Sequence, residues 1–88
     1  MDVIEAVLTR PHLPPPGVRA ALRQADELTQ AEAAVLLNVS RIAFQRWETG
    51  QAKPRAKNRA SYLDLLRGLA EKHPEVPGAH LLLLESQG

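Results

Sequence analysis

The stretch that decides the fold runs from residue 28 to residue 40 and reads LTQAEAAVLLNVS. Thr29 and Glu32 have the spacing of a capping box, in which each side chain accepts a hydrogen bond from the other residue's backbone amide. Asn38 is suited to the left-handed conformation that ends many helices, and Ser40 is a favoured N-cap residue. The stretch therefore predicts a short helix, a tight turn and the start of a second helix.

Apolar spacing predicts further helices on both sides of this pair. The second helix of the pair is expected to end at Gly50, because glycine adopts the left-handed conformation without steric cost. A long helix follows over about residues 55–72, and its apolar face is wide enough for two packing surfaces. The apolar positions of the helices before and after the pair are Val18, Ala21, Leu22, Ala25, Tyr62, Leu63, Leu65, Leu66, Leu69 and Ala70.

The two ends of the chain are less regular. Residues 2–9 have apolar side chains at helical spacing and predict a short helix. The proline-rich residues 10–17 predict a stiff extended connector, with a proline-rich ligand for a partner domain as the alternative. The run from Leu81 to Leu84 fits either a last helical turn or a short strand. We divide the chain into an N-terminal segment at 1–16, a domain at 17–73 and a tail at 74–88.

The length and composition indicate one small soluble domain. A chain of 88 residues without cysteine has neither disulfides nor thiolate metal sites, so apolar burial and helix packing must stabilise it. No uninterrupted apolar run approaches the roughly 20 residues that span a membrane. The acidic start Met1-Asp2-Val3 lacks the basic lead of a signal peptide. We therefore expect a cytoplasmic protein, and the apolar spacing described above predicts that its fold is all-α.

Positive charge is concentrated in one part of the chain. Residues 41–59 contain six basic residues and one acid, Glu48, for a net charge of +5, whereas the whole chain carries +1. The remainder is therefore acidic, with a net charge of −4. A basic segment on an acidic body favours an anionic polymer or surface as partner, with an ordinary solvated face as the alternative. The six basic residues are Arg41, Arg46, Lys53, Arg55, Lys57 and Arg59.

Two short helices joined by a turn at Asn38 and Val39 form a helix-turn-helix, the unit whose second helix enters the major groove of DNA. The neighbouring side chains agree with this arrangement. Ala34 is small where the two helices cross most closely. Leu37, Val39 and Phe44 are apolar where the corner between the helices must be filled. The stretch therefore predicts a compact helix-turn-helix domain.

Together with RWETG at 46–50 and Pro54, the stretch LTQAEAAVLLNVS resembles the lambda-repressor-like family, also called the xenobiotic-response-element family. The resemblance implies a DNA-binding domain of four or five helices that acts as a dimer on near-palindromic operators. AFQRWE at 43–48 and EKHPE at 71–75 are also similar to the DNA-binding domain of two-domain antitoxins with a zinc-binding N-terminal half. This chain has no cysteine for such a zinc site, so we expect no metal and no cofactor.

The resemblance assigns DNA contacts to individual positions. Gln30 matches a glutamine at a helix start that contacts a phosphate. Positions that face base edges are matched by Arg41, Ile42, Ala43 and Arg46. Arg46 is the best candidate for direct readout, because arginine can bind guanine O6 and N7 with both prongs. Further candidates for phosphate contacts are Ser40, Gln45, Lys53, Arg55, Lys57 and Arg59. The basic residues among them are chosen for their charge and their position.

These positions also have plainer interpretations. Arg46 is then an exposed solvated arginine, Arg41 contacts a phosphate, and Ile42 with Ala43 is tolerated apolar surface. Ile42 departs from the polar residue that is frequent in the family at this position. We therefore expect it to contact a thymine methyl group rather than an adenine.

Three further residues are expected to be structural. Arg23 and Glu48 match an arginine and a glutamate that pair across the first and third helices of the family. Trp47 is interpreted as a core and interface anchor rather than as a platform for stacked bases, because a lone tryptophan makes a poor single-strand surface.

The sequence favours a dimeric repressor that binds double-stranded DNA. The alternative is an antitoxin in which the leucine tail or the segment at 2–10 binds a protein toxin and DNA binding is autoregulatory. A third possibility is a helix-turn-helix used only as an interaction module. Enzymatic activity is not expected, because no nucleophile, base and phosphate-binding loop occur together.

Overall fold

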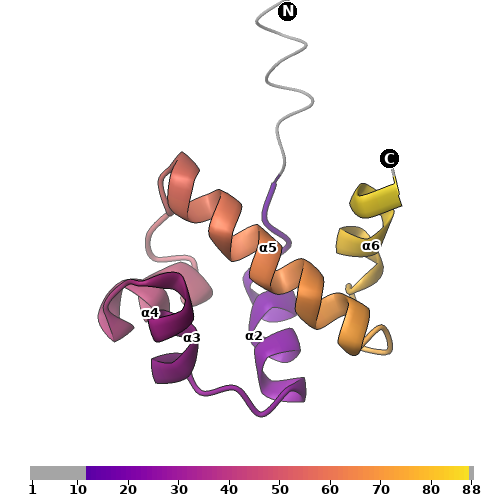
Figure 1. Ribbon diagram of the computed structural model, residues 1–88, viewed down its shortest axis with the longest axis horizontal. Coiled ribbons are helices and arrows are strands. Elements are labelled where there is room, and N and C mark those ends of the chain that lie inside the picture. The colour runs from indigo at the N-terminus through magenta and orange to yellow at the C-terminus, as the bar shows by residue number, and fades with distance from the viewer. Residues whose placement is uncertain (1–11, 88) are drawn as a thin grey trace, which may run out of the picture.

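A computed structural model describes residues 12–87, which form five α-helices and no strand. Figure 1 shows their arrangement. The helix predicted for residues 2–9 lies outside the described residues. The helices are α2 (Pro16–Ala25), α3 (Gln30–Leu37), α4 (Arg41–Thr49), α5 (Ala56–Lys72) and α6 (His80–Gln87).

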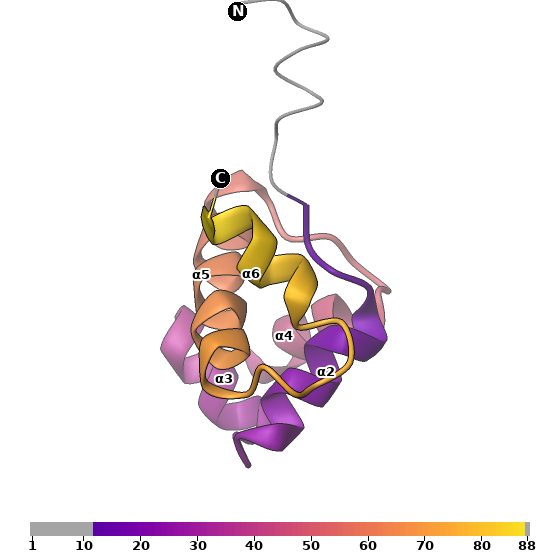
Figure 2. The same ribbon diagram turned by 90° about the vertical axis from the view of Figure 1, so that its right-hand side faces the viewer.

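The long helix α5 has other helices on two sides. α2, α3 and α4 lie on one side of it, and α6 lies on the other (Figures 1 and 2). Leu63, Leu66 and Leu69 of α5 are buried in the resulting core. Burial of such apolar side chains is the main favourable contribution to the folding of a small domain. The all-α fold predicted from the sequence is confirmed.

The start and end signals of α3 and α4 lie where the sequence predicts them. The Thr29 hydroxyl accepts a hydrogen bond from the Glu32 amide, and the Glu32 carboxylate accepts one from the Thr29 amide. Asn38 ends α3 in the left-handed conformation, with φ 57°. Ser40 caps α4 through the Ala43 amide, and Gly50 ends α4 with φ 83°. The turn between the two helices is therefore specified by local contacts.

The first described helix begins earlier than the extended connector expected at residues 10–17 allows. Pro16 is the first residue of α2, and Gly17 is already helical. Proline is well suited to this position, because the first helical residue has no intrahelical partner for a backbone N–H. Within the expected connector, the described residues that are non-helical are 12–15, and Pro14 among them is buried.

The leucine run forms the helix α6 rather than a strand. Leu82 is buried against the core, and Leu83 packs against it in part. The wide apolar face of α5 is consequently covered within one chain, by α2 and α3 on one side and α6 on the other. Both of the packing surfaces expected for this helix are therefore used within the same chain.

Two contacts hold the ends of α5 and α6 to α2. Gly78 precedes α6 with φ 92°, and a Cβ atom there would lie 2.5 Å from the Val18 Cγ2 atom. Asp26, just after α2, accepts hydrogen bonds from His73 Nε2 at 2.9 Å and Lys72 Nζ at 2.7 Å. These two bonds hold the pKa of the Asp26 carboxyl below its ordinary value. No helix within the described residues is long and apolar enough to cross a membrane.

Candidate nucleic-acid interface

The helix α4 has one buried face and one exposed face. Phe44, Trp47 and Glu48 point into the molecule and are buried. Residues three and four positions apart share one side of an α-helix, so the remaining side chains gather on the opposite side. The exposed residues of this outer face are Arg41, Ile42, Gln45 and Arg46, with Ala43 half-buried beside them. All four positions expected to face base edges therefore lie in α4, and three of them are exposed.

An aromatic cluster anchors the buried face of α4 to α5. The rings of Phe44 and Tyr62 meet edge to face with centroids 5.4 Å apart, and Trp47 lies 6.1 Å from Tyr62. Such pairs stabilise a core by about 0.5–1.5 kcal/mol beyond their apolar burial. Burial raises the pKa of Tyr62 to about 12. Trp47 is thus a core residue, as the sequence predicts, and α4 is held firmly with its outer face free.

A second set of contacts ties α4 to α2 and α3 through Glu48. Arg23 Nε donates to Glu48 Oε2 at 2.6 Å, and Arg23 Nη2 donates to Oε1 at 2.9 Å. The Gln30 amide donates to the same Oε1 atom at 3.0 Å, and Arg23 Nη1 donates to the Leu28 carbonyl. The side chain of Glu48 is only 5% exposed and that of Arg23 13%. The expected Arg23–Glu48 pair is present as a nearly buried, two-pronged contact, whose carboxylate also binds Gln30.

Sequence reasoning missed Arg19 of α2, which holds the end of α4. Its Nη1 atom donates to the Trp47 carbonyl at 2.7 Å, and its Nε atom donates to the Pro14 carbonyl at 2.6 Å. The carbonyls in the last turn of a helix lack intrahelical partners, and a cation there is favourable. Arg19 therefore fixes α4 against α2 and against the segment that precedes it. No local sequence signal marks such a contact between residues 28 positions apart.

The burial of Glu48 changes the charge balance of the candidate interface. Glu48 is the single acid among residues 41–59, and it is directed inward to Arg23. The surface made by this part of the chain is therefore more basic than its net charge of +5 indicates. We define the basic surface as the exposed cations on α4, in the loop that follows it and in the first turn of α5. They are Arg41, Arg46, Lys53, Arg55 and Lys57.

Figure 1 shows that α4 and the first turns of α5 lie at the same end of the molecule. The basic surface is thus formed by segments at one end of the molecule (Figure 1). Of the other residues expected to contact phosphates, Ser40 and Gln45 are exposed, whereas Gln30 and Arg59 are half-buried. The Ser40 hydroxyl already caps α4, and the Gln30 amide already donates to Glu48.

Nothing among the described residues suggests a metal centre, since they contain no group of three acidic, histidine or cysteine side chains that could hold an ion. His73 lies with Asp26 and Lys72 at the end of α5, and its ring joins that end to α2. The most prominent features of the described residues are therefore the basic surface and the exposed face of α4.

Comparison with known proteins agrees with this geometry. Neither the curated proteins nor the solved structures that were compared match the chain. A family model described as a helix-turn-helix domain matches residues 20–76, a range that contains α3, the turn at Asn38 and all of α4 and α5. The chain therefore belongs to the helix-turn-helix domain family.

Proposed function

We propose that the protein is a sequence-specific regulator that binds double-stranded DNA through α4 and acts as a repressor. The observation that carries the proposal is the division of α4 into two faces. Its buried face is fixed by aromatic contacts and by the Arg23–Glu48 pair. Its outer face carries two exposed arginines and a polar side chain on a surface from which the single acid is withdrawn. A helix of this kind has the shape and charge to enter a major groove.

Arg46 is proposed as the principal base-reading residue. Its side chain is exposed in the last turns of α4. Among the residues that the structure describes, it has no partner in a hydrogen bond or an ion pair. It is therefore available for a two-pronged contact with guanine, which discriminates against other bases by about 1–3 kcal/mol. Arg41 and Ile42 lie on the same outer face. Ile42 is 59% exposed, and contact with a thymine methyl group would cover its apolar surface.

The loop and first turn after α4 are proposed to bind the DNA backbone. Lys53, Arg55 and Lys57 are exposed, in the loop that follows α4 and in the first turn of α5. Phosphate contacts fix the position of a protein on DNA without reading its sequence. Arg59 is assigned the same role on its charge and position, and Gln30 on its place at the start of α3.

We further propose a dimer that binds a near-palindromic operator with half-sites about 10 base pairs apart. Support for a dimer comes from α3, whose outer side carries exposed apolar residues. Val35 is 77% exposed and Leu36 63%. With Leu28 and Ala31 they border a surface hollow of about 410 Å³. The leucine tail offers no comparable support for the antitoxin alternative, because Leu82 is buried in the core of its own chain.

The test separates base reading from backbone binding. The operator is first identified by selection from a random DNA pool, and affinities are then measured over a range of salt concentrations. Arg46→Ala should lower affinity for the operator by about 1–3 kcal/mol and relax preference at one symmetric base pair. Lys57→Ala should weaken binding to operator and scrambled duplex alike and lower the salt slope by about one.

Lys72→Ala is the matched control, because this exposed lysine lies at the opposite end of α5 and pairs with Asp26. Both duplexes should bind this variant with the parental affinity and salt slope. Equal losses of both affinities in Arg46→Ala, with base preference unchanged, would show that Arg46 acts only through its charge. A chain that selects no sequence and binds no duplex in a salt-sensitive manner would refute the proposed function.

A further inference from the structure

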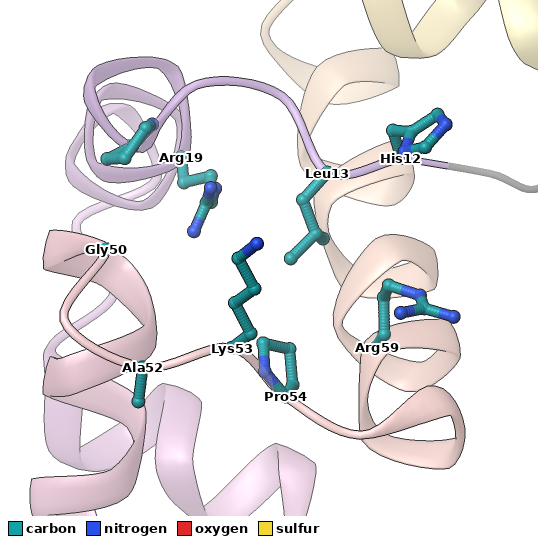
Figure 3. A pocket seen from close by; sticks show the side chains of 9 residues that line it. His12, Leu13, Arg19, Gly50, Ala52, Lys53, Pro54 and Arg59 are labelled. Carbon is teal, nitrogen blue, oxygen red and sulfur yellow. The ribbon is translucent and has the colours of Figure 1, made fainter.

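A cavity of about 570 Å³ lies beside α4, between the segment before α2 and the loop before α5. Figure 3 shows it from close by. Its size is within the range of pockets that bind small molecules, about 300–1,000 Å³. Its walls come from three separate parts of the chain, so the folded state is needed to form it. The lining residues are His12, Leu13, Pro16, Arg19, Gly50, Ala52, Lys53, Pro54 and Arg59.

The cavity is lined by three permanent cations and by no acid. Within the described side chains, Arg19, Lys53 and Arg59 form no ion pair with a carboxylate. In Figure 3 the Arg19 guanidinium and the Lys53 ammonium point into the same space. Like charges held together repel one another, so an anion bound between them is favoured. The cavity therefore favours a negatively charged ligand.

The position of Arg19 indicates a preformed site. Its two described hydrogen bonds run to the backbone carbonyls of Pro14 and Trp47, at 2.6 and 2.7 Å. These bonds orient the guanidinium but leave its positive charge without a carboxylate partner. A cation that is already oriented loses little conformational entropy when it binds an anion.

The remaining walls specify the body of the ligand. Leu13 points into the same space in Figure 3, and Pro16, Ala52 and Pro54 add further apolar surface. A single inorganic anion would leave most of this volume and its apolar walls uncovered. We propose that the cavity binds a small organic anion, with a carboxylate between Arg19 and Lys53 and an apolar body against the apolar walls.

Such a ligand would act on DNA binding, a consequence that rests on the proposed function. Lys53 and Arg59 are proposed phosphate contacts, and each also lines the cavity. A carboxylate bound there neutralises charge that the DNA backbone would otherwise meet. Linkage then requires that the anion weaken DNA binding and that DNA weaken anion binding by the same factor.

The experiment measures binding to the full chain without DNA, so that it succeeds or fails independently of the proposed function. Benzoate and naphthoate are the probes, and their neutral amides are the controls, all at constant ionic strength. Calorimetry should show saturable binding of naphthoate, and thermal unfolding should shift to higher temperature in its presence. The neutral amides should bind at least about tenfold more weakly, because they cannot form charge-assisted hydrogen bonds of equal strength.

The matched variants are Lys53→Gln and Lys57→Gln, which each remove one exposed lysine. Lys53 lines the cavity and Lys57 does not. Lys53→Gln should weaken naphthoate binding about tenfold, the effect of one lost charge-assisted bond, whereas Lys57→Gln should bind it as the parent does. Absence of binding by both carboxylates, or equal loss in both variants, would overturn the proposal. Inorganic phosphate that competes as well as naphthoate would show that the cavity accepts a bare oxyanion, such as a DNA phosphate, and would overturn it too.

Discussion

Glu48 accepts hydrogen bonds from two different helices while it belongs to a third. Its carboxylate receives Arg23 of α2 and Gln30 of α3, and its side chain is 5% exposed. Removing one partner of a buried pair leaves the other charge without compensation, at a cost of about 3–5 kcal/mol. We expect Glu48→Ala to lower Tm by more than about 10 °C, measured by circular dichroism.

Two comparisons show whether that loss comes from the uncompensated charge. Glu71→Ala removes an exposed acid from α5 and should change stability by less than about 0.5 kcal/mol. The double variant Arg23→Met/Glu48→Leu removes both charges and should be more stable than Glu48→Ala alone. If Glu48→Ala melts with the parent, the pair contributes nothing and its assignment as a structural contact is wrong.

At the level of helices, the turn before α6 depends on a close approach that only glycine permits. Gly78 has φ 92°, and a Cβ atom there would lie 2.5 Å from Val18 Cγ2 on α2. Gly78→Ala combines an unfavourable backbone conformation with a steric clash, so we expect a loss of about 2–4 kcal/mol in unfolding free energy. Denaturant titration measures it.

Gly68 provides the matched control for this substitution. It lies within α5, and a Cβ atom there would meet nothing within 4 Å. Gly68→Ala should stabilise the protein by about 0.5–1 kcal/mol, because alanine favours the helical conformation. Adding Val18→Ala to Gly78→Ala should recover part of the loss by removing the clash. A Gly78→Ala variant as stable as Gly68→Ala would show that α6 does not dock on α2 as described.

The helix ends illustrate how much of the fold a sequence can predict. Thr29, Asn38, Ser40 and Gly50 act on residues a few positions away, so their signals are contained in short stretches. Arg19 could not be found in this way, because it binds the backbone carbonyl of Trp47 and every residue has such a carbonyl. The Arg23–Glu48 pair also joins distant residues, and only the resemblance to a family suggested it.

At the level of the whole molecule, the most exposed large apolar side chains of the described residues, Val35 and Leu36, lie on α3 rather than on α5. The wide face of α5 indicated two packing surfaces correctly, but periodicity could not show that α6 of the same chain covers the second one. The basic cluster was visible in the sequence, whereas the inward direction of Glu48 required the packed helices. The cavity beside α4 had no sequence signature, since its walls come from separate segments.

The proposed dimer leads to a prediction about mass. Light scattering of the parent should report twice the chain mass, because a second copy would cover the exposed apolar side of α3. Leu36→Glu should halve that mass by placing a charge in the interface. Leu81→Glu is the control, because Leu81 lies on α6 rather than α3 and is 42% exposed. A parent that stays monomeric at high concentration, or a mass halved by Leu81→Glu alone, would contradict this interface.

The two faces of α4 place stability and the proposed recognition of DNA on different residues of one short helix. Phe44, Trp47 and Glu48 keep the domain folded, and the four outer side chains make no described hydrogen bond or ion pair with it. Substitutions at these outer positions are therefore nearly neutral for folding, since exposed changes rarely alter stability by more than about 0.5 kcal/mol. If the outer face reads DNA as proposed, duplicated copies of the gene can evolve new binding preferences one residue at a time, without passing through an unfolded ancestor.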